Sequence, residues 1–255
     1  VMEDKKIIWI TGASSGIGRA LAIKFANEGW TVAASARRES LLKELNKENS
    51  NIHSYPLDVT NVEECEFVFK KILNDHKNIK ICVFGTGIND PKSDKLFNLE
   101  NIRKIMEVNF FGVINSVNAV YKFYSEKRSG QISIISSVAG YRGLPSAGAY
   151  CASKSALTSF VESLYFDMIK KNINVKLISP GFVKTQMTEK NNSPTPMIKS
   201  PEFAANEIFF GLTKEKAFEI HFPKIFTFLM KVLQILPSSV YFKIIDIGNI
   251  YMKRD

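Results

Sequence analysis

Thr11-Gly-Ala-Ser-Ser-Gly-Ile-Gly18 joins a short apolar run at residues 6–11 to a segment of helical period that starts near Ile17, and this junction sets the architecture of the chain. Glycines at such a junction allow a tight turn and let the main chain approach a ligand closely. The N-terminus of the following helix favours negative charge, which suits a pyrophosphate. The alternative is a glycine-rich turn that binds nothing. The residues expected to contact such a ligand are Gly12, Ser14, Ser15, Gly16, Ile17 and Gly18.

The first two thirds of the chain alternate short β-branched runs with longer segments of helical period, a pattern typical of βαβ units around a parallel sheet. Strands are predicted at residues 6–11, 31–36, 52–57, 79–85, 131–136 and 174–179. Helices are predicted at residues 17–28, 40–48, 62–75, 99–124 and 150–170. Right-handed crossovers then predict an α/β fold, a Rossmann-type doubly wound parallel sheet with helices on both faces, in a single domain. Residues 1–217 would form its main body and residues 218–255 an extension of the same domain.

Composition limits the classes of function. The chain has 255 residues, of which 45% are hydrophobic and 23% charged, as in an ordinary globular protein. Its net charge is +9, but the lysines are dispersed and no compact basic run with interleaved aromatics occurs, so we expect a solvated basic surface and no nucleic-acid partner.

Cysteine and histidine usage indicates neither a metal site nor a disulfide framework. Cys65, Cys82 and Cys151 have no metal-ligand or redox spacing, and their odd number argues against paired disulfides. The three histidines are scattered singly. Met2-Glu-Asp-Lys-Lys leads directly into the first apolar run, so we expect no signal peptide and a cytoplasmic location.

Tyr150 and Lys154 are four residues apart in a predicted helix, which places the phenol and the ammonium on one face. A tyrosine has an ordinary pKa of about 10, and a neighbouring cation favours the phenolate and lowers that pKa. The pair can therefore serve as a tunable acid. Taken alone, the spacing also fits a tyrosine packed beside a surface lysine.

Two arginines, Arg37 and Arg38, follow the second predicted strand. An acidic residue usually meets the ribose of NAD about 20 residues beyond the glycines, whereas an arginine accommodates the 2′-phosphate of NADP. Here the acidic residue is absent, and a guanidinium offers a charge-assisted fork to phosphate. We therefore expect NADP(H) as cofactor. The alternative is that both arginines, Arg38 in particular, are solvated residues at a helix start.

Taken together, these pieces resemble the short-chain dehydrogenase/reductase family over residues 5–215. The further matching pieces are Leu57-Asp58-Val59, Asn109 within Val108-Asn-Phe-Phe-Gly112, Ser136-Ser137, Tyr150-Cys-Ala-Ser-Lys154, and Pro180-Gly181 followed by Thr185. The resemblance implies the family's fold, a nicotinamide cofactor, and hydride transfer between that cofactor and a carbonyl or secondary alcohol.

The resemblance also implies residue roles. Tyr150 would be the acid/base and Ser137 a donor that orients and polarises the carbonyl. Lys154 would lower the tyrosine pKa and bind the nicotinamide ribose, while Asn109 would hold a water in a proton relay. Asp58 would bind the adenine amino group beside Val59, and Thr185 the nicotinamide carboxamide. The remaining cofactor contacts implied are Gly87, Pro180, Gly181 and Val183.

One departure from the family pattern follows the fourth predicted strand. The family usually has Asn-Asn-Ala-Gly there, and this chain has Phe84-Gly85-Thr86-Gly87. Gly87 is kept, but the asparagine side chains and the hydrogen bonds with which they brace the central strands are lost. We expect a usable site with an altered or looser adenosine wall.

The substrate side is less defined. We expect the pocket to be lined by residues 89–96, 139–146 and 182–197, with the polar, proline-rich residues 186–201 forming either a mobile loop that closes over the substrate or a plain connection. The family resemblance also makes a dimer or tetramer expected. A catalytically silent NADP-binding regulator or scaffold is the alternative function.

The C-terminal extension is strongly apolar. Between Phe222 and Pro237 its only charges are lysines, and they interrupt the run before it reaches the roughly 20 residues of a spanning helix. Packing on the domain, a subunit contact, and an interfacial membrane helix within residues 222–255 all remain open. The extension also favours a hydrophobic substrate, such as a lipid, a steroid or a 3-oxoacyl group.

Overall fold

The computed structural model describes residues 6–90, 97–190 and 195–252. Within them one parallel sheet has the strand order β3-β2-β1-β4-β5-β6-β7. The strands are β1 (Ile7–Thr11), β2 (Thr31–Ala36), β3 (Ile52–Pro56), β4 (Ile81–Phe84), β5 (Gln131–Ile135), β6 (Asn174–Pro180) and β7 (Glu219–Phe222). The order reverses between β1 and β4, so the predicted doubly wound α/β sheet is confirmed.

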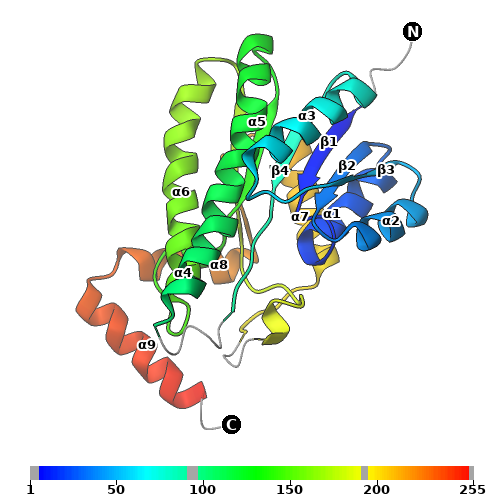
Figure 1. The fold of residues 1–255 in the computed structure, drawn as a ribbon. Helices are drawn as coiled ribbons and strands as arrows, with labels where there is room; N and C mark the ends of the chain where they lie inside the picture. The colour runs from blue at the N-terminus through cyan, green and yellow to red at the C-terminus, as the bar shows by residue number, and fades with distance from the viewer. Residues whose placement is uncertain (1–5, 91–96, 191–194, 253–255) are drawn as a thin grey trace.

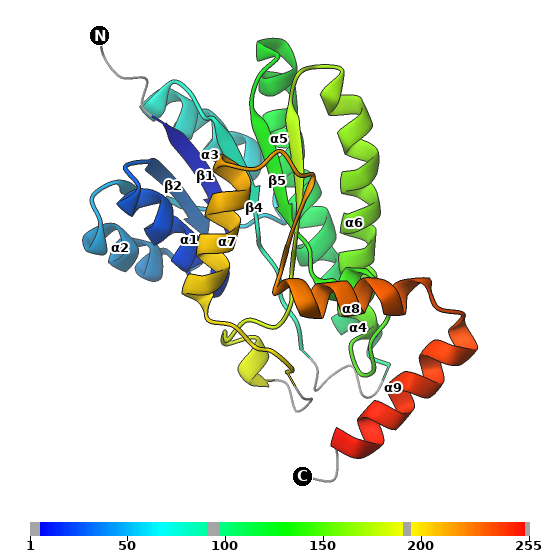
Figure 2. The same ribbon diagram turned by 180° about the vertical axis from the view of Figure 1, so that it is seen from behind.

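Helices cover both faces of the sheet (Figures 1 and 2). On one face lie α1 (Gly16–Asn27), α2 (Glu39–Glu48) and α7 (Pro201–Thr213). On the other lie α3 (Val62–His76), α5 (Gly112–Lys127) and α6 (Gly148–Ile169), with α4 (Leu99–Met106) beside α6. The strands are nearly continuous apolar runs because both of their faces are buried.

The predicted helix at residues 99–124 is interrupted. A π-helical turn, Glu107–Phe111, separates α4 from α5, and it contains Asn109. Such turns within helices are frequent at functional sites. The turn places the Asn109 side chain against the main chain that follows β4.

Two elements between residues 200 and 222 were not predicted. Helix α7 begins at an N-cap, Ser200, whose hydroxyl accepts from Phe203 N at 3.1 Å, and Pro201 occupies the first turn. Strand β7 is a four-residue run that extends the sheet beyond β6. Part of the predicted loop, residues 191–194, lies outside the described residues, but Thr188–Lys190 forms a 3-10 turn and Lys199 pairs with Val183.

The C-terminal extension continues as α8 (Lys224–Ile235) and α9 (Ser238–Met252). One face of α8 packs on the domain through Phe226, Met230 and Leu233, in a cluster with Val138 and Tyr141. Its outer face stays exposed, as do several apolar residues of α9. Packing on the domain therefore accounts for only part of the apolar surface of the extension. Among the described helices, none combines the length and hydropathy that crossing a membrane requires.

Candidate active site

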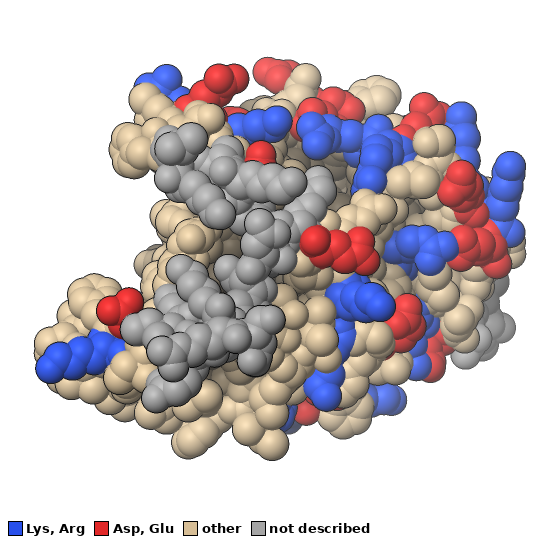
Figure 3. Space-filling model, turned by 90° about the horizontal axis from the view of Figure 1, so that it is seen from below, with Lys and Arg blue, Asp and Glu red and all other residues tan. Residues whose placement is uncertain are grey.

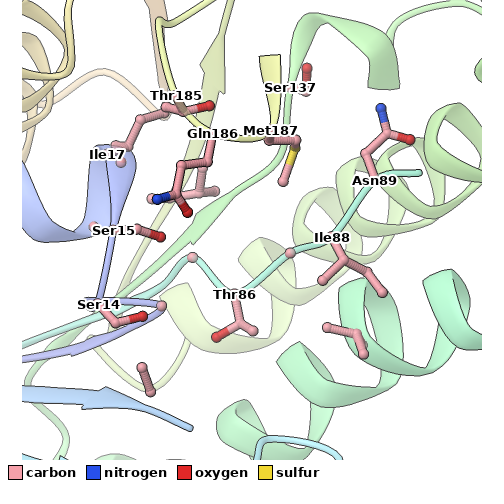
Figure 4. A pocket seen from close by; sticks show the side chains of 18 of the residues that line it. Ser14, Ser15, Ile17, Thr86, Ile88, Asn89, Ser137, Thr185, Gln186 and Met187 are labelled. Atoms are coloured by element: carbon pink, nitrogen blue, oxygen red, sulfur yellow. The ribbon is translucent and has the colours of Figure 1, made fainter. Parts of the chain in front are cut away.

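A cavity of about 840 Å³ lies beyond the carboxyl ends of β1, β4, β5 and β6. This is where doubly wound sheets bind ligands. Figure 4 shows Ser14, Ser15 and Ile17 on one side of it, Ile88, Asn89 and Ser137 on the other, and Thr185, Gln186 and Met187 between. Every predicted catalytic and cofactor-binding residue lines this cavity except Asn109, which is buried behind its wall. The prediction that residues 139–146 line the pocket is wrong, because none of them borders this cavity.

The glycine turn has the geometry of a phosphate cradle. Gly12 has φ +75, and a Cβ there would lie 2.9 Å from the Gly85 carbonyl oxygen. A Cβ on Gly18 would overlap the carbonyl of Gly12. Helix α1 starts at Gly16, so its N-terminal N–H groups and dipole face the cavity. The turn therefore fits the pyrophosphate of a dinucleotide.

Both arginines that follow β2 line the cavity. Arg38 Nη2 donates to Ser14 Oγ at 2.9 Å and to Ser15 Oγ at 2.8 Å. Arg37 Nη1 lies 4.0 Å from Asp58 Oδ2 and its side chain is mostly exposed. Arg38 is exposed and stands at the start of α2, as the alternative had it, but these hydrogen bonds tie its guanidinium to the glycine turn. The two guanidinium groups and two hydroxyls form a cationic corner that fits a phosphate.

The end of β3 contributes Asp58 and Val59. Asp58 Oδ1 accepts from Thr60 N at 3.0 Å and from Thr60 Oγ1 at 2.9 Å, which fixes the carboxylate at the cavity wall. Val59 is buried against Gly112, and its carbonyl accepts from Asn115 Nδ2 at 3.0 Å. These contacts hold both residues where the sequence predicted an adenine site.

The unusual Phe84-Gly85-Thr86-Gly87 segment is braced without asparagine. Phe84 is fully buried, and its ring packs edge to face on Trp9 with centroids 5.5 Å apart. Gly85 N donates to Thr11 Oγ1 at 3.2 Å. A Cβ at Gly85 would lie 2.7 Å from Ile135 Cδ1, so any larger residue there would push on β5. Aromatic packing and one threonine hydroxyl replace the asparagine bonds.

Ser137 and Tyr150 meet in the cavity. Ser137 follows β5 and caps the 3-10 turn Val138–Gly140, with Ala139 N donating to its Oγ at 3.1 Å. Burial raises the pKa of Tyr150 to about 12, and the hydrogen bond with Ser137 acts in the opposite direction. The net shift is upward because desolvation of the phenolate is its largest cause; Lys154 is not among the causes, so its expected effect on this pKa stays a prediction.

Lys154 lies one turn after Tyr150 in α6, and its ammonium is 5.8 Å from the centre of the Tyr150 ring. The predicted placement on one face is confirmed. Lys154 Nζ donates to Ile135 O at 3.0 Å. Burial lowers the pKa of Lys154 to about 8. The side chain is thus a buried cation held at the end of β5, poised to lose or gain its proton near neutral pH.

Asn109 joins the chain after β4 to α6. Its Oδ1 accepts from Ile88 N at 2.7 Å, and its Nδ2 donates to Ile88 O at 2.9 Å and to Ser153 Oγ at 3.1 Å. Ser153 Oγ in turn donates to Tyr150 O at 2.7 Å. A Cβ on Gly87 would lie 3.6 Å from both Asn109 Oδ1 and Lys154 Nζ, so Gly87 lies close to both groups and borders the cavity beside Lys154. Asn109 therefore holds the two walls of the site together.

The chain after β6 closes the opposite side of the cavity. Pro180, Gly181, Val183 and Thr185 all line it, as predicted. Thr185 N donates to Thr188 Oγ1 at 2.8 Å, and the Thr185 methyl group packs where a side chain on Gly16 would lie. Gly181 N donates to Phe222 O at 2.7 Å, which ties this segment to β7.

Several lining residues were not singled out from the sequence. They are Thr86, Ile88, Asn89, Asn101, Lys104, Gln186, Met187 and Thr188. The predicted ranges 89–96 and 182–197 contain four of them, but no motif marks the individual positions. Residues 91–96 of the predicted lining lie outside the described residues. In the described ranges no group of three or more His, Cys, Asp or Glu side chains could hold a metal.

Comparisons with known proteins agree with this geometry. The family model for short chain dehydrogenase matches residues 6–196. A Myxococcus xanthus protein described as an uncharacterized oxidoreductase is 31% identical over 236 residues, which cover 91% of this chain and 93% of that protein. A 3-oxoacyl-(acyl-carrier-protein) reductase from Thermotoga maritima is 30% identical over 229 residues, which cover 84% of this chain and 93% of that protein.

Solved structures show the same architecture. An alcohol dehydrogenase from Thermococcus sibiricus, complexed with 5-hydroxy-NADP, has a TM-score of 0.75 and 26% identity, covering 85% of this chain and 95% of that chain. A short chain dehydrogenase from Burkholderia cenocepacia in complex with NADP has a TM-score of 0.81 at 23% identity, covering 94% of this chain and 97% of that chain. This second match shows a similarity of fold. The chain therefore belongs to the short-chain dehydrogenase/reductase family of oxidoreductases.

Proposed function

We propose that this protein is an NADP(H)-dependent enzyme that interconverts a carbonyl group and a secondary alcohol on a hydrophobic substrate. The observation that carries the proposal is that Ser137, Tyr150 and Lys154 share one cavity with the glycine turn. A nucleotide site and a proton donor thus open into the same space. A silent regulator would need only the first of these.

NADPH, when bound, supplies the hydride that reaches the carbonyl carbon. Negative charge then develops on the carbonyl oxygen, and the hydroxyls of Ser137 and Tyr150 are the donors that would stabilise it. With its pKa near 12, Tyr150 holds a proton at neutral pH and can transfer it to that oxygen. The ammonium of Lys154 beside the ring would stabilise the phenolate that remains. We propose that Asn109 holds a water for the return of the proton.

The residues around the cavity divide between the two halves of the cofactor. The glycine turn would hold the pyrophosphate, and Arg37 and Arg38 the 2′-phosphate. Asp58, Val59 and Gly87 would border the adenosine. The residues proposed for the nicotinamide half are Tyr150, Lys154, Pro180, Gly181, Val183 and Thr185. Similar solved structures hold NADP or NAD, so the choice of NADP(H) over NAD(H) rests on Arg37 and Arg38 at the cavity.

The catalytic part of the proposal is tested by NADPH consumption with a panel of long-chain ketones, 3-oxoacyl thioesters and small soluble ketones. Tyr150→Phe should lose activity on every substrate that the wild type reduces, because the phenol is the proton donor. Tyr165→Phe is the matched control, since Tyr165 lies in the same helix and packs on Phe218 away from the cavity. Equal turnover by Tyr150→Phe and wild type would make the assignment wrong. Reduction of only the small soluble ketones would contradict the hydrophobic substrate.

We also propose that the outer faces of α8 and α9 contact an anionic membrane surface. Ile225, Phe228 and Ile235 of α8 are 73%, 68% and 81% exposed. Lys224 and Lys243 are exposed beside this apolar surface, and basic residues flanking an apolar helix face favour anionic lipid. In the view from below, charged side chains gather at the right and along the upper edge, and the lower left is mostly uncharged (Figure 3).

Deletion of residues 222–255 would test this poorly, because Phe222 is fully buried in β7. Substitution of Ile225, Phe228 and Ile235 by serine leaves the packed face of α8 intact. This variant should lose co-sedimentation with phosphatidylserine vesicles. A control with Phe67→Ser and Phe166→Ser, which are 66% and 65% exposed elsewhere, should bind like wild type. Equal binding by all forms would contradict membrane contact, and loss of self-association alone would identify a subunit contact.

A further inference from the structure

One arginine, Arg142, links the segment between Ser137 and Tyr150 to the C-terminal extension through four hydrogen bonds. Arg142 lies in this segment, more than 90 residues in sequence from its partners. Its guanidinium donates to main-chain carbonyls at the end of α8 and to a hydroxyl at the start of α9. The partners are Leu233 O at 2.7 Å, Gln234 O at 3.1 Å, Leu236 O at 2.6 Å and Ser238 Oγ at 3.2 Å. One side chain therefore caps α8 and sets the start of α9.

Tyr241 of α9 completes the contact from the other side. The Arg142 guanidinium lies 4.1 Å from the centre of the Tyr241 ring, a close cation–π arrangement. The Tyr241 hydroxyl donates to Gly143 O at 2.5 Å, and the residue is only 2% exposed. Adjacent residues of the segment, Arg142 and Gly143, are thus both held by α9.

A second contact runs beside the first. The hydroxyl of Tyr141 donates to Glu219 of β7, which also forms an ion pair with Lys231 of α8. Burial would raise the pKa of Glu219, but the hydrogen bonds from Lys231 and Tyr141 outweigh it and lower that pKa. The carboxylate stays charged and holds the segment to both elements. Both polar and apolar contacts therefore hold the Ser137–Tyr150 segment to β7 and α8.

The other end of this segment reaches the reacting hydroxyls. Val138, directly after Ser137, packs in the same cluster as Tyr141 and Phe226. Leu144 N donates to the Cys151 sulfur at 3.3 Å, and Cys151 is the neighbour of Tyr150. A displacement of the segment would therefore move both Ser137 and Tyr150. Figure 2 shows α8 and α9 at the end of the sheet where these residues lie.

We propose that Arg142 is a positioning residue: it anchors the Ser137–Tyr150 segment on α8 and α9, so that the C-terminal extension sets the relative placement of the two hydroxyls. This inference rests on the proposed function. Arg142 is not among the residues that line the cavity, so it acts through the segment. A misplacement of about 1 Å at reacting groups can cost roughly 100-fold in rate.

The experiment compares Arg142→Ala, Arg142→Lys and Tyr241→Phe with wild type. Arg128→Ala is the matched control, because Arg128 also donates to a main-chain carbonyl, Lys170 O at 3.0 Å, but far from the site. We expect Arg142→Ala to lower kcat about 10- to 100-fold and to leave NADPH affinity within about twofold. Arg142→Lys keeps the positive charge but not the planar set of guanidinium N–H donors, so its kcat should lie between those of Arg142→Ala and wild type. The control should match wild type.

A second measurement needs no substrate. Cys65, Cys82 and Cys151 are all buried, and the maleimide labelling rate of each is read by peptide mapping under native conditions. Arg142→Ala should speed labelling of Cys151 about tenfold or more and leave Cys65 and Cys82 unchanged, and Tyr241→Phe should give a smaller effect of the same kind.

The outcomes separate the two proposals. Faster labelling of Cys151 alone, together with the loss of kcat, supports positioning. Equal acceleration at all three cysteines would show general destabilisation and overturn it, as would an unchanged kcat or an unchanged Cys151 rate. A wild type that binds NADPH but reduces no carbonyl would refute the proposed function, and the labelling rates would still decide whether Arg142 holds the segment.

Discussion

Replacement of Arg38 by alanine should convert a preference for NADPH into near indifference between NADPH and NADH. Arg38 is bound to both serine hydroxyls of the glycine turn and lines the cavity beside Arg37. The two cofactors differ only in the 2′-phosphate, so a residue that binds this group affects NADPH alone. The substitution removes the guanidinium but leaves the main chain of β2 in place.

The magnitude follows from the charge of the partner. Hydrogen bonds to charged groups contribute about 1.5–3 kcal/mol, which corresponds to a loss of roughly 10- to 150-fold in NADPH affinity. The Arg37 side chain is mostly exposed, and its Nη1 lies 4.0 Å from Asp58 Oδ2. Arg37→Ala should therefore lose less free energy of NADPH binding, about 1 kcal/mol or under. The double variant should lose more than either single variant.

The assay is equilibrium titration of each variant with NADPH and with NADH, followed by cofactor fluorescence. NADH affinity is the internal control. If loss of the hydrogen bonds from Arg38 to Ser14 and Ser15 loosened the glycine turn, binding of both cofactors would weaken equally. Arg128→Ala serves as the remote control. The reasoning is refuted if Arg38→Ala binds NADPH as wild type does, or if both affinities fall by the same factor.

Three further predictions concern stability. Gly12→Ala should destabilise the protein by about 2 kcal/mol more than Gly29→Ala in urea denaturation, because both positions have positive φ but only Gly12 has backbone within 3 Å of the new Cβ; equal costs would contradict this. Asn109→Ala leaves buried partners unpaired and should lower the free energy of unfolding by about 3 kcal/mol. Asn115→Ala, which loses a single strong hydrogen bond, should lower it by about 1 kcal/mol. An Asn109→Ala variant as stable as wild type would show that Asn109 does not join the two walls of the site. Burial lowers the pKa of Lys154 from 10.5 to about 8. Between pH 8 and pH 10.5 the unfolded chain therefore holds a proton on Lys154 that the folded protein lacks, so the free energy of unfolding rises with pH. The unfolding free energy of wild type minus that of Lys154→Met should therefore increase by about 2–3 kcal/mol between pH 7.5 and 10, and a constant difference would contradict the buried cation.

Local patterns in the sequence were sufficient for the sheet and for the motifs that border the cavity. The apolar runs that became β1 to β6 are bounded by clear turn residues, and the glycine turn marks its own place between β1 and α1. Helix α7 could have been predicted, because Ser200-Pro-Glu202 is a helix-start signal. Strand β7 is too short to predict: Glu219–Phe222 alternates polar and apolar residues, but four residues do not distinguish a strand from the apolar run that follows.

Other features depend on contacts between distant segments. Arg38 meets Ser14 and Ser15 only because β1 and β2 are neighbours in the sheet. The raised pKa of Tyr150 comes from burial, which packing decides and spacing does not show. The role inferred for Arg142 is visible only once α8 and α9 are folded against the segment that contains it.

Transfer of deuterium to a ketone substrate from NADPH that carries deuterium at both hydrogen positions of nicotinamide C4 tests the central claim most directly. Wild type should yield an alcohol with one deuterium on the former carbonyl carbon. Tyr150→Phe should still bind NADPH but form this product at least about 100-fold more slowly, because the proton donor is missing. An unlabelled alcohol, or equal rates of label transfer by the two proteins, would contradict the proposed site.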